Sequence, residues 1–300
     1  MTDSAMTELV VTPEWLAGQL GRPDVRVVDV SVITTPPAAQ GLPWGALPAR
    51  AEYLEAHIPG AAFVDLVTEL SDAAAPFPYT LPAAGQVDGV FRRLGVDEGT
   101  HVVLYDGQAS SFACRAWLVL RHFGLDAVSV LDGGIGAWTA AGLPVESGES
   151  PAFPAGSARA RGREGVVCGT ADVVRIVEEG GGQLVNVLAR SQWDGSGVSS
   201  YARVGQIPGS IEAVAARLVD PASGAFVPLA DAARLFEEAE IDLARPIVTY
   251  CGGGVSAAKA ALALARLGAQ AVAVYDGSLS EWTADPELPL EGAPTGGGTR

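Results

Sequence analysis

One cysteine stands where a thiol could act as a nucleophile. Cys251 follows the apolar run IVTY and begins the segment CGGGVS, after which SAAKAALALARL has the composition of a helix that ends at Gly268. In open α/β sheets, ligands bind beyond the carboxyl ends of the strands, where loops lead into helix N-termini. The free N–H groups of such a loop and the positive end of the helix favour a thiolate and can bind an anion attached to its sulfur. We therefore predict that Cys251 is a nucleophile and that its binding loop consists of Gly252, Gly253, Gly254, Val255 and Ser256.

The two other cysteines are expected to be structural. Cys168 precedes the start of a predicted helix, and Cys114 lies in a helical stretch with large neighbours. Three cysteines without a CxxC pair or a Cys/His cluster predict neither a disulfide framework nor a metal site. A lone cysteine is more often a buried structural residue, but the glycine-rich loop after Cys251 favours catalysis. Lys259 is the nearest cation to this loop in the sequence, and it is expected to face solvent.

The segment around Cys251 is one copy of an internal repeat. VVLYDGQASSFACRAWLVLRHFGLDAVSVLDGGIGAW corresponds to IVTYCGGGVSAAKAALALARLGAQAVAVYDGSLSEW, so that Asp106 takes the place of Cys251. The Asp-Gly pairs at Asp132 and Asp276 match as well, and turn chemistry is sufficient to explain both aspartates. Upstream, the turn HIPG of the first copy corresponds to QIPG in the second. The chain therefore consists of two related halves.

The order of elements predicts an α/β protein with two tandem domains. Thr12 and Pro13 begin a predicted helix before the strand VRVVDV, and Thr170 begins the corresponding helix before QLVNVL. Short apolar runs that alternate with helical patterns are typical of a parallel sheet flanked by helices on both faces. We place the first domain at residues 1–145, a linker rich in Ser, Pro, Ala, Gly and Arg at 146–165, and the second domain at 166–300.

The composition excludes several classes of partner. A formal net charge of −16 at pH 7 disfavours binding to nucleic acids and to anionic membranes. The N-terminus has no basic flank before an apolar core, and no apolar run approaches the length of a membrane helix, so a cytoplasmic protein is expected. The segments GGGQL and TGGGTR lack the strand-to-helix context of a dinucleotide site. No cofactor is predicted.

Taken together, the motifs resemble those of the tandem-domain rhodanese-like sulfurtransferases, which include thiosulfate sulfurtransferase and 3-mercaptopyruvate sulfurtransferase. The resemblance covers nearly the whole chain and rests on HIPGA with Phe63 and Asp65, on the DGG…W and DGS…W endings, and on CGGGVSA. It implies that Cys251 attacks a small sulfur donor, becomes a persulfide, and passes the outer sulfur to a thiol, to cyanide or to another nucleophile, with a protein thiol as a further candidate acceptor. It also implies that the first domain is not catalytic, because Asp106 replaces the nucleophile there.

Departures from the family pattern bear on the substrate. The cysteine loop of rhodaneses resembles CRKGVT, and that of mercaptopyruvate sulfurtransferases resembles CGSGVT. In this chain Gly252 and Gly253 stand where the rhodanese loop has its Arg and Lys. The loss of both cations favours 3-mercaptopyruvate over thiosulfate as the donor. Gly253 also lacks the hydroxyl of the serine that the resemblance places in a proton relay. His57 matches the histidine of that relay, but no aspartate lies shortly upstream of it. The relay is therefore predicted to be incomplete.

A second departure concerns the family's D-x-R pattern, because this chain has Asn186-Val187-Leu188. Arg190 and Arg203 are candidates for a clamp on a substrate carboxylate, and surface arginines in solvent are the open alternative. Dual-specificity phosphatases share the rhodanese architecture and have a cysteine loop that ends in an arginine. Ala257 stands at that position in this chain, so this class of enzyme is disfavoured. The changes at Gly253, Leu188 and Asn186 leave a second hypothesis open, namely a sulfur carrier or regulatory binding protein of low turnover.

Overall fold

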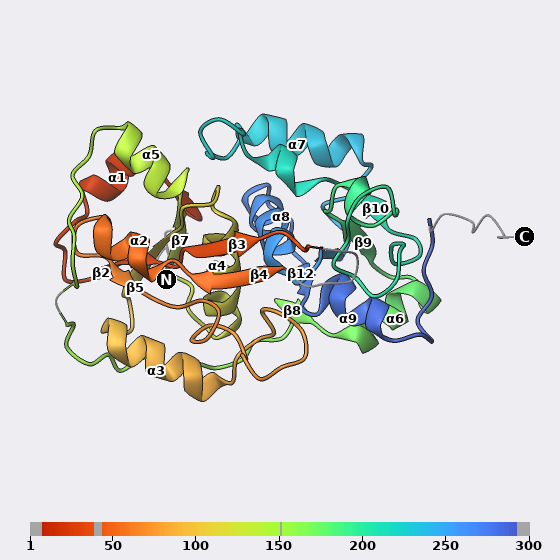
Figure 1. Cartoon of the computed structure of the whole chain (residues 1–300), viewed down its shortest axis with the longest axis horizontal. Coiled ribbons are helices and arrows are strands. Elements are labelled where there is room, and N and C mark those ends of the chain that lie inside the picture. The colour runs from red at the N-terminus through yellow and green to blue at the C-terminus, as the bar shows by residue number, and fades with distance from the viewer. Residues whose placement is uncertain (1–7, 39–43, 151, 293–300) are drawn as a thin grey trace, which may run out of the picture.

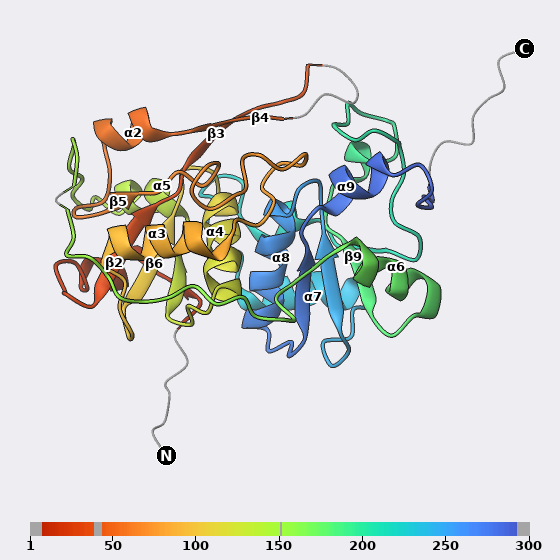
Figure 2. The ribbon, with the colours of Figure 1, turned by 90° about the horizontal axis from the view of Figure 1, so that it is seen from below.

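The computed structural model describes residues 8–38, 44–150 and 152–292, in which two parallel sheets of five strands lie side by side (Figures 1 and 2). The strand order is β1-β7-β6-β2-β5 in the first sheet and β8-β12-β11-β9-β10 in the second. The two orders correspond strand for strand along the internal repeat. The predicted fold of two tandem α/β domains is therefore confirmed.

The first sheet contains β1 (Val10–Val11), β2 (Val25–Asp29), β5 (Ala62–Phe63), β6 (His101–Tyr105) and β7 (Val128–Leu131). The second contains β8 (Val167–Cys168), β9 (Gln183–Asn186), β10 (Ile211–Glu212), β11 (Ile247–Tyr250) and β12 (Val272–Tyr275). The central strands β7, β9 and β11 are buried along their whole length, as expected for parallel strands covered on both faces.

Helices cover both faces of the first sheet. On one face, Val27, Val103 and Tyr105 pack against α1 (Pro13–Ala17) and α5 (Gly134–Ala140). On the other face, alternate residues of the same strands pack with α3 (Ala84–Leu94) and α4 (Ser111–His122). The first domain also contains α2 (Arg50–Glu55), and the second contains α6 (Thr170–Glu179), α7 (Leu229–Glu238), α8 (Val255–Arg266), α9 (Ser278–Ala284) and the 3₁₀ turns η1 (Arg190–Gln192) and η2 (Ala215–Leu218). Among the described helices, none combines the length and hydrophobicity that a transmembrane span requires.

Helices α4 and α8 pack against each other between the two sheets (Figure 2). Eight successive residues of α8, from Ala257 to Leu264, are buried, and all but one of them are Ala or Leu. Buried residues of both domains form one continuous hydrophobic cluster. The domains therefore share a core, and their facing loops are held in a fixed relation.

An antiparallel hairpin of β3 (Val32–Thr35) and β4 (Gly45–Pro48) extends from the first domain toward the second (Figure 2). It inserts between β2 and α2 and has no counterpart in the second sheet. The hairpin thus brings first-domain residues toward the site that the second domain carries.

The segment predicted as a linker lies along the first domain. Glu146 exchanges two backbone hydrogen bonds of 2.9 Å with His57, and the N–H groups of Gly156 and Ala158 donate to Arg92 and Val96. The composition of this segment predicted a linker, and such pairing fixes its extended backbone against the first domain. The exact domain boundaries remain a prediction.

Candidate active site

Cys251 directly follows β11, and its side chain is nearly buried, with 3% of the residue exposed. Its N–H donates to Ser278 Oγ at 3.1 Å, and its carbonyl accepts from the N–H of Leu279 at 3.0 Å. Ser278 has a positive φ of 49°, whereas the corresponding residue of the first copy is Gly134. A serine in this costly conformation at the start of α9 thus fixes the backbone of the cysteine.

The loop after Cys251 leads straight into α8. Gly254 is the N-cap residue, with φ +80°, and α8 begins at Val255. Within the described ranges, the N–H groups of Gly253, Gly254 and Val255 have no hydrogen-bond partner. Free N–H groups and the positive end of a twelve-residue helix make this loop suitable for an anion next to the sulfur.

Each of the three glycines lies against a side chain from another segment. A Cβ at Gly252 would lie 2.5 Å from Tyr201 Oη, and a Cβ at Gly254 would lie 2.7 Å from Arg115 Nη1. A Cβ at Gly253 would approach Pro78 at 3.2 Å. Side chains of other segments therefore fill much of the space that the absent Cβ atoms leave.

A cavity of about 360 Å³ opens above Cys251. Both domains form it. The first contributes Thr34, Trp44, Pro78, Tyr79, Gln108, Ser111 and Phe112, and the second contributes Leu188, Gln192, Ser200, Tyr201, Cys251, Gly252, Gly253, Val255, Ser256 and Ser280. Burial raises the pKa of Tyr79 to about 12 and raises the pKa of Tyr201 well above its ordinary value, so both phenols stay neutral. The described lining contains no Asp, Glu, Lys or Arg.

A buried arginine of the first domain lies against the loop of the second. Arg115 of α4 is fully buried, and its Nη2 forms an ion pair of 2.6 Å with Asp276 Oδ1. The same nitrogen donates to the carbonyl of Tyr79, and Asp276 Oδ2 accepts from the N–H of Leu81 at 2.9 Å. Within the described residues, Arg115 Nε and Nη1 have no hydrogen-bond partner. Arg115 therefore connects the Tyr79 wall of the cavity to the loop of Cys251.

The turn aspartates and Lys259 differ from the sequence-based expectation. Asp132 accepts a hydrogen bond of 2.7 Å from the N–H of Phe226, so it joins the domains as Asp276 does. Turn chemistry alone therefore does not explain them. Lys259 is only 5% exposed rather than facing solvent, because α8 packs against α4, and burial lowers its pKa.

The loop at Asp106 shows what the corresponding N–H groups can bind. Asp106 Oδ1 accepts from the N–H groups of Gln108 and Ser110, at 2.6 and 3.1 Å, and Oδ2 accepts from that of Ala113 at 2.8 Å. Burial raises the pKa of Asp106, while these bonds and the charge of Lys259 oppose the shift. In the first domain a carboxylate of the chain thus occupies the position that lies open beside Cys251.

The three residues predicted as clamp or relay are not brought to the cavity. Arg190 is largely exposed, where it pairs with Glu212 at 2.6 Å. The guanidinium of Arg203 donates to backbone carbonyls between Trp282 and Leu288, among them that of Thr283 at 3.0 Å. The site therefore contains neither arginine, because both are engaged elsewhere in the second domain.

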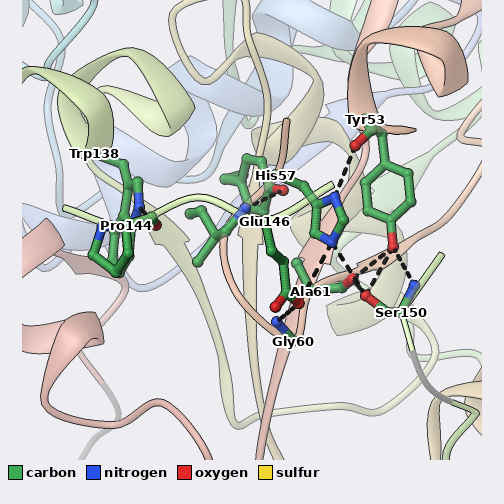
Figure 3. A network of polar contacts seen from close by, with 10 residues as sticks. Tyr53, His57, Gly60, Ala61, Trp138, Pro144, Glu146 and Ser150 are labelled. Atoms are coloured by element: carbon green, nitrogen blue, oxygen red, sulfur yellow. Dashed lines mark hydrogen bonds and ion pairs between the residues drawn. The ribbon is translucent and has the colours of Figure 1, made fainter. Parts of the chain in front are cut away.

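His57 lies in the interior of the first domain, away from Cys251. Figure 3 shows its ring between Tyr53, Glu146 and Ser150. Nδ1 is 2.8 Å from the carbonyl of Tyr53, Nε2 is 3.6 Å from Glu146, and the ring stacks on Tyr53 with centroids 4.1 Å apart. These contacts fasten the segment after α5 to the HIPG turn, which is a structural role.

The two remaining cysteines lie in environments that keep them protonated. Burial raises the pKa of Cys114 far above its ordinary value and raises that of Cys168 to about 12. Neither lines the cavity. Sequence reasoning did not identify Arg115, Tyr79, Tyr201 or Trp44 as site residues, and only Arg115 had a signal, because it occupies the position of Lys259 in the repeat.

Comparisons with known proteins identify the family of this chain. Residues 12–141 and 171–285 each match the family described as Rhodanese-like domain. A 3-mercaptopyruvate sulfurtransferase of Escherichia coli K12 is 32% identical over 95% of this chain and 98% of its own length. A mitochondrial thiosulfate/3-mercaptopyruvate sulfurtransferase of Arabidopsis thaliana is 33% identical over 97% of this chain and 80% of its own.

A solved structure supports the same assignment. The crystal structure of SseA from Escherichia coli, described with the fold and mechanism of 3-mercaptopyruvate sulfotransferases, superposes with a TM-score of 0.77 at 30% identity. The match covers 91% of this chain and 99% of that one. The chain therefore belongs to the rhodanese-like domain family, with two tandem domains, and is a sulfurtransferase.

Proposed function

We propose that this sulfurtransferase carries the transferred sulfur as a persulfide on Cys251. One observation carries the proposal. In the first domain, the loop N–H groups bind the carboxylate of Asp106, whereas Cys251 replaces that carboxylate in the second domain and leaves its loop N–H groups open. A persulfide is an anion one atom longer than a thiolate, so its outer sulfur can take the place of the carboxylate oxygens.

The donor half-reaction would begin with the Cys251 thiolate. It attacks the sulfur of the donor, and the carbon–sulfur bond of 3-mercaptopyruvate breaks. The electron pair of that bond goes to the enolate of pyruvate, which takes up a proton from solvent, and the sulfur remains on Cys251 as a persulfide. The outer sulfur then releases the proton that it carried as the donor thiol, and the loop N–H groups stabilise the resulting persulfide anion.

We favour 3-mercaptopyruvate over thiosulfate as the donor. The described lining of the cavity offers no cation, and a dianion would lose more solvation free energy there than a monoanion. The Escherichia coli relative, which is named for 3-mercaptopyruvate alone, supports this choice, whereas the Arabidopsis relative is named for both donors. Thiols and cyanide are the proposed acceptors, a protein thiol is a further one, and the cytoplasm is the proposed location.

A second candidate function is a sulfur carrier or regulatory binding protein of low turnover. Leu188 lines the cavity where the family resemblance places an arginine. Asn186 is buried and binds the Gln206 amide and the N–H of Leu188, at 3.0 and 3.1 Å, so it does not face the cavity. High turnover with a small donor and a small thiol would exclude this candidate.

Intact-protein mass spectrometry tests the persulfide directly. The reduced protein is exposed separately to 3-mercaptopyruvate and to thiosulfate, and the mass of one added sulfur is the signal. We expect it with 3-mercaptopyruvate in the wild type and in the control Cys168→Ser, and we expect its absence in Cys251→Ser. One added sulfur on Cys251→Ser, or none on the wild type from either donor, would contradict the proposal.

A further inference from the structure

The cavity above Cys251 is larger than the proposed donor requires. Its volume is about 360 Å³, which lies in the range of roughly 300–1,000 Å³ found for pockets that enclose drug-sized ligands. 3-Mercaptopyruvate has a skeleton of only three carbons. The remaining space is therefore available to the second substrate, the sulfur acceptor.

Aromatic rings form much of the lining. Trp44, Tyr79 and Phe112 come from the first domain and Tyr201 from the second. The rings of Tyr79 and Phe112 are tilted, with centroids 5.9 Å apart. Tyr79 has a positive φ of 60°, and its carbonyl accepts from buried Arg115, so this ring is held in place by a strained backbone. Such rings favour an aromatic or apolar ligand.

The polar groups of the described lining are hydroxyls and amides. Both side-chain amides of this lining are engaged within the protein. Gln108 Nε2 donates to the Val32 carbonyl at 2.6 Å, and Gln192 Oε1 accepts from the N–H of Ala189 at 3.1 Å. The neighbouring cations are paired elsewhere: Arg115 with Asp276 and Arg190 with Glu212. An acceptor with an anionic body would find no opposite charge in this lining.

Loading of the enzyme strengthens this selectivity. Once Cys251 carries the persulfide, the loop N–H groups are occupied by its anionic outer sulfur. A carboxylate on the acceptor would then be desolvated close to a like charge, and both effects are unfavourable in a cavity of low polarity.

The geometry points to a thiol with an uncharged, aromatic body as the acceptor of this enzyme. This inference rests on the persulfide proposed above. The acceptor sulfur attacks the outer sulfur, the sulfur–sulfur bond breaks, and its electron pair goes to Cys251 Sγ. The thiol proton ends on the product, which leaves as an aromatic hydropersulfide, so atoms and electrons balance without a further oxidant or reductant.

A matched pair of acceptors tests the inference. Enzyme loaded with 3-mercaptopyruvate and freed of donor is mixed with benzyl mercaptan or with 4-(mercaptomethyl)benzoate, which differ by one carboxylate. The rate at which Cys251 loses its added sulfur is followed by mass spectrometry and divided by the rate of each thiol with glutathione persulfide. We expect benzyl mercaptan to be favoured by about tenfold or more. Equal rates, or faster transfer to the carboxylate, would overturn the inference.

Two variants assign the effect to the cavity. Trp44→Ala removes an aromatic ring that is 44% exposed, and Leu47→Ala is its control on the same hairpin, outside the cavity. We expect only Trp44→Ala to slow transfer to benzyl mercaptan, by several fold, and to slow it more than transfer to 2-mercaptoethanol. Gln192→Arg should lower the preference for the uncharged thiol or reverse it.

The outcomes also separate this inference from the proposed function. If the wild type does not acquire a persulfide, both fail. If it loads and transfers but does not distinguish the two thiols, or if Leu47→Ala has the same effect as Trp44→Ala, only the acceptor class is wrong.

Discussion

Arg115 and Lys259 occupy the same position of the internal repeat, on α4 and α8, and each directs its charge toward a strand-end loop of the other domain. Arg115 pairs with Asp276 and lies against Gly254, while the charge of Lys259 acts on Asp106. Helices α4 and α8 pack together between the sheets. Arg115 of the first domain therefore acts on a loop of the second domain, and Lys259 of the second domain acts on a loop of the first. The first domain, which lacks the cysteine, thus completes the site of the second.

Arg115→Met should therefore impair both folding and the reactivity of Cys251. It leaves Asp276 without its ion pair and releases the Tyr79 carbonyl, and removing one partner of a buried pair costs about 3–5 kcal/mol. We expect a lower free energy of unfolding in urea. In the fraction that remains folded, alkylation of Cys251 and persulfide loading should also be slower.

Lys259→Met is the matched control for this prediction. It removes a similarly buried cation at the same repeat position, but that cation acts on the loop of Asp106. We expect a loss of stability with little change in Cys251 alkylation. If both variants slow alkylation equally, Arg115 has no specific role at the cysteine loop.

Gly252→Ala should slow persulfide formation, because the new methyl group would lie 2.5 Å from Tyr201 Oη and displace the ring or the loop. Combining it with Tyr201→Phe removes that oxygen, although ring carbons remain at 3.2 and 3.3 Å. We expect the double variant to recover part of the loading rate, measured by mass spectrometry. A double variant that loads no faster than Gly252→Ala would show that another contact limits the loop.

Local pattern was enough to predict the fold and the location of the candidate nucleophile. The repeat, the strand run before Cys251 and the helix-forming composition after it are properties of adjacent residues, and the paired sheets confirm that fold. Burial of Lys259 could also have been predicted. Its helix has small or apolar residues on all sides, and such a helix is normally buried.

The cavity walls could not be predicted in the same way. Tyr79, Trp44 and Tyr201 carry no motif. The first two line the cavity above Cys251 because α4 packs on α8 and a hairpin without a repeat counterpart extends over the site, and Tyr201 comes from a loop of the second domain. Ser278 stood where the first copy has a glycine, and a positive φ at serine is too uncommon to expect from sequence. Tertiary contacts within and between the domains, rather than spacing, select these residues.

Asp29→Asn should remove a pH dependence of stability. Burial raises the pKa of Asp29 to about 6, above its value of about 3.9 in the unfolded chain. Between these values the folded protein keeps a proton that the unfolded chain has lost, so stability falls as pH rises from about 4 to 6, by up to about 3 kcal/mol. We expect the free energy of unfolding of the variant, measured in urea, to show no such decrease between about pH 4 and 6 and to exceed that of the wild type at pH 7.

The second domain offers the reciprocal control. Asn186 ends β9 as Asp29 ends β2, and both side chains accept a hydrogen bond from the N–H two residues later, at 3.1 and 2.8 Å. Asn186→Asp should therefore introduce a decrease in stability over the same pH range. An unchanged pH profile in both variants would mean that other groups determine it.

Asp106→Ala should destabilise the first domain without preventing persulfide formation on Cys251. The change removes the acceptor of three loop N–H groups and the countercharge of buried Lys259, so we expect the free energy of unfolding to fall by about 3 kcal/mol. The N–H groups beside Cys251 are not touched by it. Folded variant, isolated by size exclusion, should still gain one sulfur from 3-mercaptopyruvate in the mass spectrum. If folded Asp106→Ala gained none, Asp106 would have to take part in loading, and the first domain would be catalytic after all.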